Sequence, residues 1–540
     1  MCTMTRAIAT VFAVAMTVAG CSNGDSRPVT EASVTEAPVT EAPVTEVPAP
    51  IPGAVGAVGT AGAQGAQGDT AWDLASFSGA DIWVDPVNGH DSATGADRAH
   101  ALHTVGAAWD TIPTGETLTT GVRIMLAPGT YPVDGSVNYW EDKHGTAGAP
   151  IIVTSADGPH TARFDADINM FAVSHFAFVG VDIIRQGDTF HCEQCDHILI
   201  RDAELSGGTA AHETVKVNQS QYISIEDSDI HGADDNNIDF VAVQYARVAG
   251  NRIHDAQDWC EYATGGSAYM RIEDNEIFDC GTGGVTAGQG TGFQFMKAPW
   301  LNYEAYGIDV VGNTIHDTEG AGLGVAGGYN IVFAHNTLYA IGSRSHAAEF
   351  VLGRRGCDGG TDIQCTANHD AGGWGSTDEE MQFIPNKHIW FVDNLIINPT
   401  DHPSMWQQFQ IDGPATPPAS SGVPSPAAAD DDLHIVGNVI WNGAADLPTG
   451  AGDGCPTSNT RCNEQQLLAD NAINTVEPHL VDPSTGDYRL TAESAAALSS
   501  GVAVPTLAWP DGDIPIAVPA DPAQSIVAAG GPPGAGVAGP

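Results

Sequence analysis

Four short segments each place one polar residue between two apolar residues: Val215-Lys216-Val217, Ile238-Asp239-Phe240, Cys260-Glu261-Tyr262 and Phe293-Gln294-Phe295. Alternation with a period of two is typical of a β-strand whose apolar and polar residues face opposite sides. If these strands are neighbours, Lys216, Asp239, Glu261 and Gln294 form one outward column. Leu323-Gly324-Val325 continues this column with a glycine, which leaves a bare patch. A base, two carboxylates and an amide in line can bind a cation and move a proton.

Carboxylates near this column make it a candidate cation site. Asp235, in the run Gly232-Ala-Asp-Asp-Asn-Asn, precedes the strand of Asp239, and Ca²⁺ prefers oxygen ligands. We therefore predict Asp235, Asp239 and Glu261 as ligands of Ca²⁺. Lys216 is the predicted base, provided that burial or the neighbouring cation lowers its pKa. The further candidates for the base or for a substrate clamp are Arg271 and Lys297.

Two alternatives to proton abstraction remain open. Lys216 beside Asp239 can be an ordinary cross-strand ion pair of small energy. Asp239 and Glu261 can instead be the two carboxylic acids of a glycoside hydrolase, which lie about 5 to 9.5 Å apart. In any of these sites, aromatic side chains can stack on sugar rings. The predicted substrate-binding residues are Gln294, Trp259 and Trp300.

A repeated phrase indicates how these strands are arranged. It consists of an apolar residue, a polar pair, Asn, any residue and then Ile or Leu, and its asparagines are Asn251, Asn275, Asn313, Asn336, Asn394 and Asn438. Looser copies end at Ile183, Leu205 and Ile230. Such near-regular recurrence is typical of stacked units that cannot bury their apolar faces alone. The alternation within each copy predicts strands, and we expect the asparagines at equivalent bends to bond to one another.

Three passages resemble the right-handed parallel β-helix proteins of the pectate-lyase-like superfamily, over roughly residues 80–500. They are Ile82–Pro86 with Asn88–Ser92, Val122–Tyr131 and Asp482–Leu490. The resemblance implies an all-β fold, a single-stranded right-handed parallel β-helix (a solenoid) with long loops on one side. A short helix within residues 100–112 is expected to cap the first coil, because its apolar residues share one face. These residues are Leu102, Val105, Trp109 and Ile112.

The same resemblance implies action on a polysaccharide. In the related lyases, Ca²⁺ held by acidic side chains neutralises a uronate carboxylate, a Lys or Arg removes the C5 proton, and the 4-linked sugar leaves by β-elimination. We expect a uronate-containing polymer as substrate if Lys216 acts in this way. The architecture also hosts hydrolases and non-catalytic adhesins or glycan-binding proteins, which remain alternatives.

Both ends of the chain have compositions unsuited to a packed domain. Residues 1–20 are typical of a signal peptide, and Val18-Ala-Gly-Cys21 resembles a bacterial lipobox. Processing there would leave Cys21 lipidated, so we expect an extracytoplasmic protein anchored to the bacterial cell envelope; an ordinary secretory signal is the alternative. Residues 21–79 are predicted to be a low-complexity tether and residues 501–540 a similar tail, with one β-helix domain at 80–500 between them.

The remaining cysteines, apart from Cys2, fall into four pairs that are close in sequence: Cys192 and Cys195, Cys260 and Cys280, Cys357 and Cys365, and Cys455 and Cys462. An even set of local pairs in an exported protein favours disulfides that pin adjacent coils or loops. A redox or zinc half-site at Cys192 and Cys195 is the alternative.

The chain is strongly acidic, with a formal net charge of −48 and only 19 Lys and Arg residues. Such a surface repels nucleic acid and anionic membranes. We therefore expect no nucleic-acid partner and membrane contact only through the lipid anchor. The polysaccharide partner is what the resemblance implies, and we expect a monomer. The carboxylates either solvate the surface in saline surroundings or bind Ca²⁺.

Overall fold

The computed structural model describes residues 77–137, 139–357, 363–377, 382–443 and 454–497, with Trp72, Leu74, Thr449 and Gly450. All of them belong to one unit of the chain, Gln64–Pro540. The predicted signal peptide, Cys21, the predicted tail and nearly all of the predicted tether lie outside the described residues. Among the described residues, no helix combines the length and apolar character needed to cross a membrane.

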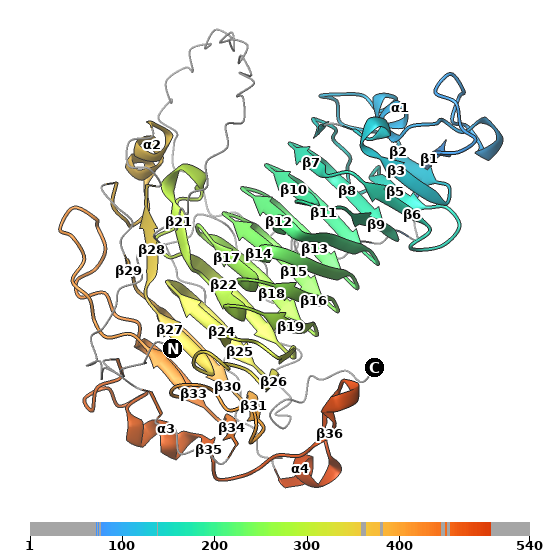
Figure 1. Ribbon diagram of the computed structural model, residues 1–540. Helices are drawn as coiled ribbons and strands as arrows, with labels where there is room; N and C mark the ends of the chain where they lie inside the picture. The colour runs from blue at the N-terminus through green and yellow to red at the C-terminus, as the bar shows by residue number, and fades with distance from the viewer. Residues whose placement is uncertain are drawn as a thin grey trace, which may run out of the picture. The chain divides into compact units, whose positions relative to one another are not determined.

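The described chain winds into a parallel β-helix whose strands stack in three ladders (Figure 1). The first ladder runs β1 (Gly79–Val84), β2 (Gly121–Leu126), β5 (Ile151–Ser155), β8 (Ser174–Val179), β11 (Asp196–Arg201), β13 (Gln221–Glu226), β15 (Gln244–Ala249), β18 (Ser267–Glu273), β22 (Ala305–Val311), β25 (Gly328–Ala334), β30 (Lys387–Val392) and β33 (Asp431–Val436). Every pairing in it is parallel, as the repeated phrase predicts.

The other two ladders share the long strands β12 (Glu204–Asn218) and β14 (Asp229–Val241), which bend from one ladder into the next. The second ladder also contains β3 (Gly129–Pro132), β6 (Ala162–Asp165), β9 (Val181–Ile184), β16 (Arg252–Ala256), β19 (Glu276–Cys280), β23 (Thr314–His316), β26 (Thr337–Tyr339), β31 (Leu395–Asn398), β34 (Val439–Asn442) and β35 (Ala472–Ile473). The third ladder contains β4 (Trp140–Glu141), β7 (Ile168–Phe171), β10 (Phe190–Glu193), β17 (Trp259–Thr264), β20 (Gly283–Ala287), β24 (Ala321–Ala326), β27 (Ala348–Val351) and β32 (Phe409–Ile411).

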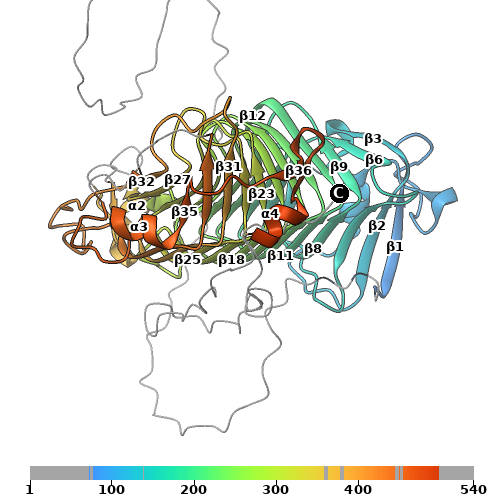
Figure 2. The same ribbon diagram turned by 90° about the horizontal axis from the view of Figure 1, so that it is seen from below.

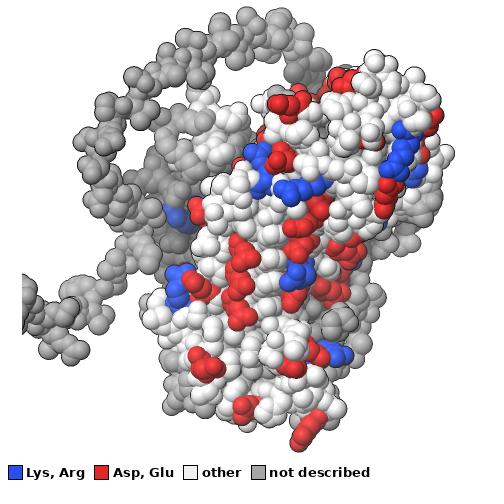
Figure 3. All heavy atoms as spheres, turned by 45° about the vertical axis from the view of Figure 1, so that its right-hand side comes forward, with Lys and Arg blue, Asp and Glu red and all other residues white. Residues whose placement is uncertain are grey.

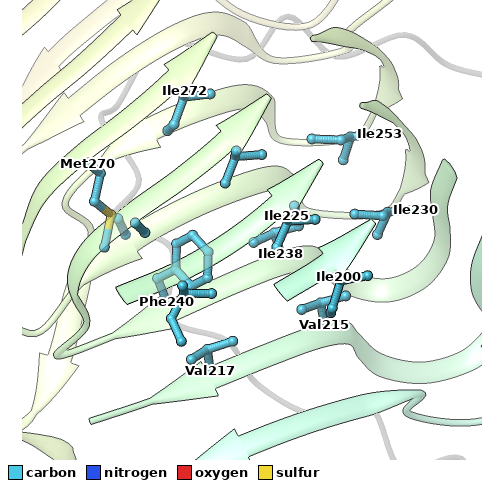
Figure 4. Packing of buried hydrophobic residues seen from close by; sticks show 14 of the residues in the cluster. Ile200, Val215, Val217, Ile225, Ile230, Ile238, Phe240, Ile253, Met270 and Ile272 are labelled. Atoms are coloured by element: carbon cyan, nitrogen blue, oxygen red, sulfur yellow. The ribbon is translucent and has the colours of Figure 1, made fainter. Parts of the chain in front are cut away.

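The core is a continuous column of apolar side chains enclosed by the three ladders. Ile225, Ile253 and Phe240, which come from the first, second and third ladders, are at most 1% exposed and point toward one another (Figure 4). Figure 2 shows β8, β11 and β18 on the opposite side of the stack from β12. Because each coil buries its apolar residues only against its neighbours, strand alternation decides which side chains remain outside for function.

The predicted asparagine ladder is confirmed. Each side-chain amide donates to the Oδ1 of the asparagine in the next coil, from Asn251 through Asn275, Asn313, Asn336 and Asn394 to Asn438, at 2.9–3.1 Å. Asn471 adds a further rung, accepting from Asn438 at 2.8 Å. The same Oδ1 atoms also accept backbone N–H groups of the preceding coil. The ladder therefore fixes how successive coils align.

Helices are few and lie outside the ladders. α1 (Val105–Asp110) is shorter than the expected helix at 100–112, and its Val105 and Trp109 are buried in the same cluster as the first coils; its role as a cap remains a prediction. The others are α2 (Ile363–Ala371), α3 (Glu464–Asp470) and α4 (Ala492–Ala497). A small sheet of β21 (Gly290–Gly292), β28 (Gly353–Gly356) and β29 (Gln382–Ile384), and a hairpin of β36 (Leu480–Asp482) and β37 (Asp487–Leu490), complete the described structure.

All four predicted cysteine pairs are disulfides: Cys192–Cys195, Cys260–Cys280, Cys357–Cys365 and Cys455–Cys462. The alternative of a redox or zinc half-site at Cys192 and Cys195 is not needed, because their sulfurs are bonded to each other. Four disulfides are typical of proteins that fold in an oxidising compartment.

Acidic side chains follow the strand stacking, and one face of the molecule shows them in columns (Figure 3). On the second ladder, Glu204, Asp229, Arg252 and Glu276 lie in register on successive coils. Arg252 forms ion pairs with Asp229 at 3.1 Å and with Glu276 at 3.0 Å. A cation placed between two carboxylates offsets part of the repulsion that the stacking creates.

Candidate functional site

The outward residues of the third ladder form one polar column. Its members, in coil order, are Asn169, His191, Lys216, Asp239, Tyr262, Thr286, Gly324, Glu349 and Gln410. The predicted placements of Lys216, Asp239 and Gly324 in this column are confirmed. Tyr262 and Thr286 stand where Glu261 and Gln294 were expected.

Lys216 lies between two carboxylates. Its Nζ is 2.7 Å from Glu213 Oε1 and 2.8 Å from Asp239 Oδ2. The side chain of Asp239 is fully buried, whereas that of Lys216 is 29% exposed. The ammonium group therefore closes over the buried carboxylate and shields it from solvent.

The charges in this cluster disfavour Lys216 as a base. Burial lowers its pKa, but Asp239 and Glu213 outweigh burial and raise the pKa above the usual value for lysine. Burial raises the pKa of Asp239 to about 6, although Lys216 acts in the opposite direction. A general base must lose its proton near the working pH. The lowered lysine pKa that the lyase mechanism needs is therefore not found in this arrangement.

The predicted alignment of Glu261 is wrong. Glu261 pairs with Ile238 and Val285, both inward residues, so its side chain points into the coil. Both carboxylate oxygens lack a hydrogen-bond partner among the described residues, and burial raises its pKa to about 8. Glu261 is therefore neither beside Asp239 in the outward column nor placed to share a metal ion or a substrate with it.

The segment containing Gln294 is not a ladder strand. Phe293–Phe295 forms a single 3₁₀ turn, η3, in a loop between the third and first ladders, and β20 supplies Thr286 to the column instead. Lys297 is exposed in the same loop. Trp300 packs on a small cluster that includes the Cys357–Cys365 disulfide, which indicates a packing role.

Arg271 lies on the first ladder, in register with Arg247 and Asp309. Its Nε contacts Glu273, and its side chain is mostly buried. It is therefore on a different face of the coil from Lys216, and the two do not belong to one site.

A cleft of about 460 Å³ lies over the bare patch at Gly324. Its lining includes Thr286, Gly324 and Glu349 of the polar column, Trp259 of β17 and Arg354 of β28. A Cβ on Gly324 would lie 3.0 Å from Cη2 of Trp259 and 3.2 Å from Oγ1 of Thr286. The missing side chain is therefore part of what keeps the cleft open. Trp259 is the predicted substrate-binding residue that the structure brings to this cleft.

The wall that carries Arg354 is held by a buried ion pair. Arg355 and Glu304 are both fully buried, with Nη2 2.6 Å from Oε1. Arg355 also donates to the carbonyls of Leu301 and Tyr303 at 2.7 and 3.0 Å. Oε2 of Glu304 accepts from Thr264 of the third ladder at 2.6 Å. This network joins the segment that carries Arg354 to the third ladder, whose strands also line the cleft.

Sequence reasoning missed the carboxylate of Glu349, which lines this cleft, and that of Asp412, which follows the next strand and does not line it. Glu349 follows Gly324 in the column, and its Oε1 accepts from Ser345 Oγ at 2.9 Å. Asp412 directly follows β32, with Oδ2 accepting from the N–H of Leu352 at 3.1 Å and Oδ1 accepting from Gln410 at 3.0 Å. The alternation Ala348-Glu349-Phe350 carries the same signal as Val215-Lys216-Val217 and could have extended the column to Glu349.

A second group of possible cation ligands lies beside Lys216. One ligand atom each from His212, Glu213 and Asp235 lie within 4.8 Å of one another. Burial and the neighbouring carboxylate of Asp258 raise the pKa of Asp235 to about 6. Of the three predicted metal ligands, only Asp235 belongs to this group.

Comparison with known proteins supports the fold. Residues 168–357 match the family model described as "Right handed beta helix region", which agrees with the parallel ladders. Over residues 168–357 the parallel β-helix of this chain is thus similar to the right-handed kind, as predicted from the sequence. No curated protein matches the sequence.

Several solved structures are similar to this chain at low identity. A pectate lyase, Pel9A, is 13% identical with a TM-score of 0.37, covering 83% of this chain and 97% of its own. A rhamnogalacturonan lyase is 13% identical with a TM-score of 0.36, covering 78% and 98%. A lacto-N-biosidase from Eubacterium ramulus is 10% identical with a TM-score of 0.39, covering 69% and 66%.

Proposed function

We propose that this protein binds a polysaccharide on the outer face of the third ladder, with sugar rings seated in the cleft over Gly324. The cleft itself is the observation that carries the proposal. Its lining combines the mostly buried aromatic ring of Trp259, the polar side chains of Thr286 and Glu349, and the cationic side chain of Arg354. A tryptophan face suits the apolar face of a sugar ring, and fixed polar groups suit its hydroxyls.

The test is calorimetric titration of the protein with a panel of neutral and acidic polysaccharides. Trp259→Ala should weaken binding by removing the stacking surface, and Gly324→Val should weaken it by filling the cleft. Trp390→Ala is the matched control, because Trp390 lies on the first ladder and stacks on His434. Binding that survives both cleft substitutions, or no binding to any polysaccharide, would refute the proposal.

Ca²⁺-assisted β-elimination of a uronate polymer is the second candidate function. The group formed by His212, Glu213 and Asp235 favours it, because carboxylate oxygens suit Ca²⁺ and the ion would relieve the repulsion between Asp235 and Asp258. Bound there, Ca²⁺ would supply charge neutralisation of a substrate carboxylate. The raised pKa of Lys216 and the inward position of Glu261 count against it. Ultraviolet absorbance of the unsaturated product, with and without Ca²⁺, separates this candidate from simple binding.

We also propose an extracytoplasmic location with a lipid at Cys21. The four disulfides support an oxidising compartment, and the lipobox-like sequence supports the anchor. Mass spectrometry of the N-terminal peptide from membranes tests it: a diacylated Cys21 is expected, and a soluble product cleaved elsewhere would contradict it.

A further inference from the structure

We infer that His175, Asp196 and His197 form a metal site on the first ladder, which takes Zn²⁺ or a divalent transition-metal ion of similar chemistry. One ligand atom from each residue lies within 4.8 Å of the other two. Their strands, β8 and β11, lie on the opposite side of the stack from β12 (Figure 2). Metal binding there therefore does not depend on a glycan in the cleft.

Two adjacent coils bring the histidines together. β8 and β11 pair in parallel, with Ser174 in register with Asp196. His175 and His197 are the next residues of the two strands, so they occupy the same position of successive coils. Their rings stack with centroids 4.2 Å apart and an angle of 8° between the ring planes. The register of the coils thus sets the two imidazoles side by side.

The same position is occupied by tyrosine in the coils that follow. Tyr222, Tyr245 and Tyr269 continue the stack, with neighbouring ring centroids 4.3–5.1 Å apart from His197 onward. A flat ring is therefore all that stacking requires at this position. Histidine keeps the flat ring and adds nitrogen donors, which suit Zn²⁺, Cu²⁺ and Ni²⁺.

One of these nitrogens is buried and unpaired. Nδ1 of His175 has no hydrogen-bond partner among the described residues. Nδ1 of His197 contacts Oδ1 of Asp196, and the other oxygen of Asp196 accepts from Gln221. Burial and the neighbouring His197 lower the pKa of His175 to about 4, so its ring is neutral near pH 7. A buried polar atom without a partner costs free energy, and a metal ion between the three groups would remove this cost.

The donor set and its spacing suit a transition metal better than Ca²⁺. Two imidazoles and one carboxylate are ligands typical of Zn²⁺, whereas Ca²⁺ takes oxygen ligands. Tetrahedral Zn²⁺, with bonds of about 2.0–2.1 Å, keeps its ligand atoms about 3.3 Å apart. Since the three ligand atoms lie within 4.8 Å of one another, no pair has to approach by more than about 1.5 Å. Water would take the fourth position.

The experiment uses the untagged full chain, made metal-free with a chelator and titrated with zinc sulfate in a calorimeter. Zn²⁺ should bind and raise the melting temperature, because an ion that binds only the folded state stabilises it. His175→Tyr and His197→Tyr keep a flat ring of the kind found at Tyr222 but remove a nitrogen donor. Each should weaken binding of one Zn²⁺ equivalent by about 100-fold or more and abolish the rise in melting temperature. Their metal-free melting temperatures should stay close to wild type.

A spectroscopic reading counts the nitrogens directly. Cu²⁺ in place of Zn²⁺ should give an electron paramagnetic resonance spectrum with coupling to two imidazole nitrogens in wild type. Each tyrosine variant should lose this two-nitrogen spectrum.

The matched control is His254→Tyr on the second ladder. His231 and His254 also stack in register, with centroids 4.8 Å apart and an angle of 3°. Both ring nitrogens of His254 already contact carboxylates, Asp229 at 2.9 Å and Asp255 at 2.8 Å. This variant should therefore bind Zn²⁺ as wild type does.

Three outcomes would overturn the inference. The first is that the metal-free chain binds no Zn²⁺. The second is that Zn²⁺ binding persists in both tyrosine variants of the first ladder, or is lost in His254→Tyr instead. The third is that Ca²⁺ displaces Zn²⁺ at equal concentration, which would show a site made of oxygen ligands.

Discussion

Neighbouring residues of the third ladder show how strand register decides side-chain chemistry. Asp239 faces outward and is paired with Lys216 at 2.8 Å. Glu261, in the next coil, is one position out of register with it and lies inside the core, without a hydrogen-bond partner among the described residues. Asp239 is a buried carboxylate that a lysine covers, whereas Glu261 is a buried acid with no cation beside it. A shift of one residue exchanges these environments.

Glu261 should make stability depend on pH. Its folded pKa is about 8, against 4.5 for the ordinary group. Between these values the unfolded chain is ionised while the folded chain keeps its proton, so the free energy of unfolding falls as pH rises from about 4.5 to about 8. Glu261→Gln should remove this fall, which amounts to roughly a few kcal/mol.

Melting temperatures of wild type and Glu261→Gln across this pH window provide the measurement. The curves should diverge as pH rises, with the variant more stable at pH 8. Glu193→Gln, an outward carboxylate, should follow wild type throughout. Parallel curves for Glu261→Gln and wild type would show that Glu261 is ionised or solvated in the folded protein.

At the scale of elements, two buried networks hold the site in place: the asparagine ladder and the ion pair between Arg355 and Glu304, here called the loop clamp. The ladder joins coils end to end through side-chain amides. The pair Arg355 and Glu304 joins β28, which lines the cleft, to the third ladder. Both are buried polar networks, so removing one member leaves its partners unpaired at a high cost.

Asn313→Ala should destabilise the domain by roughly 2–4 kcal/mol, because it removes the buried acceptor of the Asn275 backbone N–H and the buried donor to the Ile272 carbonyl. Denaturant unfolding followed by circular dichroism measures the change. Asn169→Ala, which removes an outward, half-buried amide from β7, should cost well under half as much. Equal losses in the two variants would mean that the ladder adds nothing beyond an ordinary polar contact.

Arg355→Met should cost about 3–5 kcal/mol, because it leaves Glu304 buried and unpaired. It should also weaken glycan binding, since the wall that carries Arg354 loses its attachment. Thermal melting and calorimetry give the two readings. Arg461→Met breaks an exposed pair with Asp432 and should cost about 1 kcal/mol or less. An Arg355 variant as stable as the Arg461 variant would contradict the clamp.

The sequence predicted the coil and its asparagine bends, because both depend on local alternation and on one residue type at each bend. It predicted the register less well. Because the apolar neighbours of Glu261 were expected to face inward, Glu261 was predicted to lie on the surface. In the structure its carboxyl group is buried, and Tyr262 faces outward instead. The glycine-rich strand Gly283–Ala287 lacks the bulky side chains that mark a strand, so Phe293–Phe295 was assigned its place. The cleft could not be predicted, because part of its lining comes from β28, which belongs to a small separate sheet outside the repeated coils.

For the molecule as a whole, repulsion among the many carboxylates lowers the stability of the folded state. The chain has 67 acidic residues against 19 Lys and Arg, and parallel stacking brings acidic residues into columns (Figure 3). Repulsion between exposed charges is screened by salt, since the Debye length falls from about 10 Å at 0.1 M to about 3 Å at 1 M. Screening should therefore favour the folded state.

The melting temperature should rise with sodium chloride from low to molar concentration. Potassium chloride at equal ionic strength should have the same effect, because screening does not distinguish the two cations. Differential scanning fluorimetry measures both series. A flat or falling melting temperature would show that paired cations such as Arg252 already balance the columns.

Helix α3 lies at the last coil, next to the strand that ends the first ladder. β33 ends the first ladder, with β30 on one side only. α3 packs beside it through Leu467, which is fully buried, and Asn471 donates to the carbonyl of Leu467 at 2.9 Å. An uncovered strand edge is a template for another chain. α3 thus covers the end of the β-helix. A molecule lacking α3 would expose the edge of β33, and identical molecules could pair end to end and form fibres.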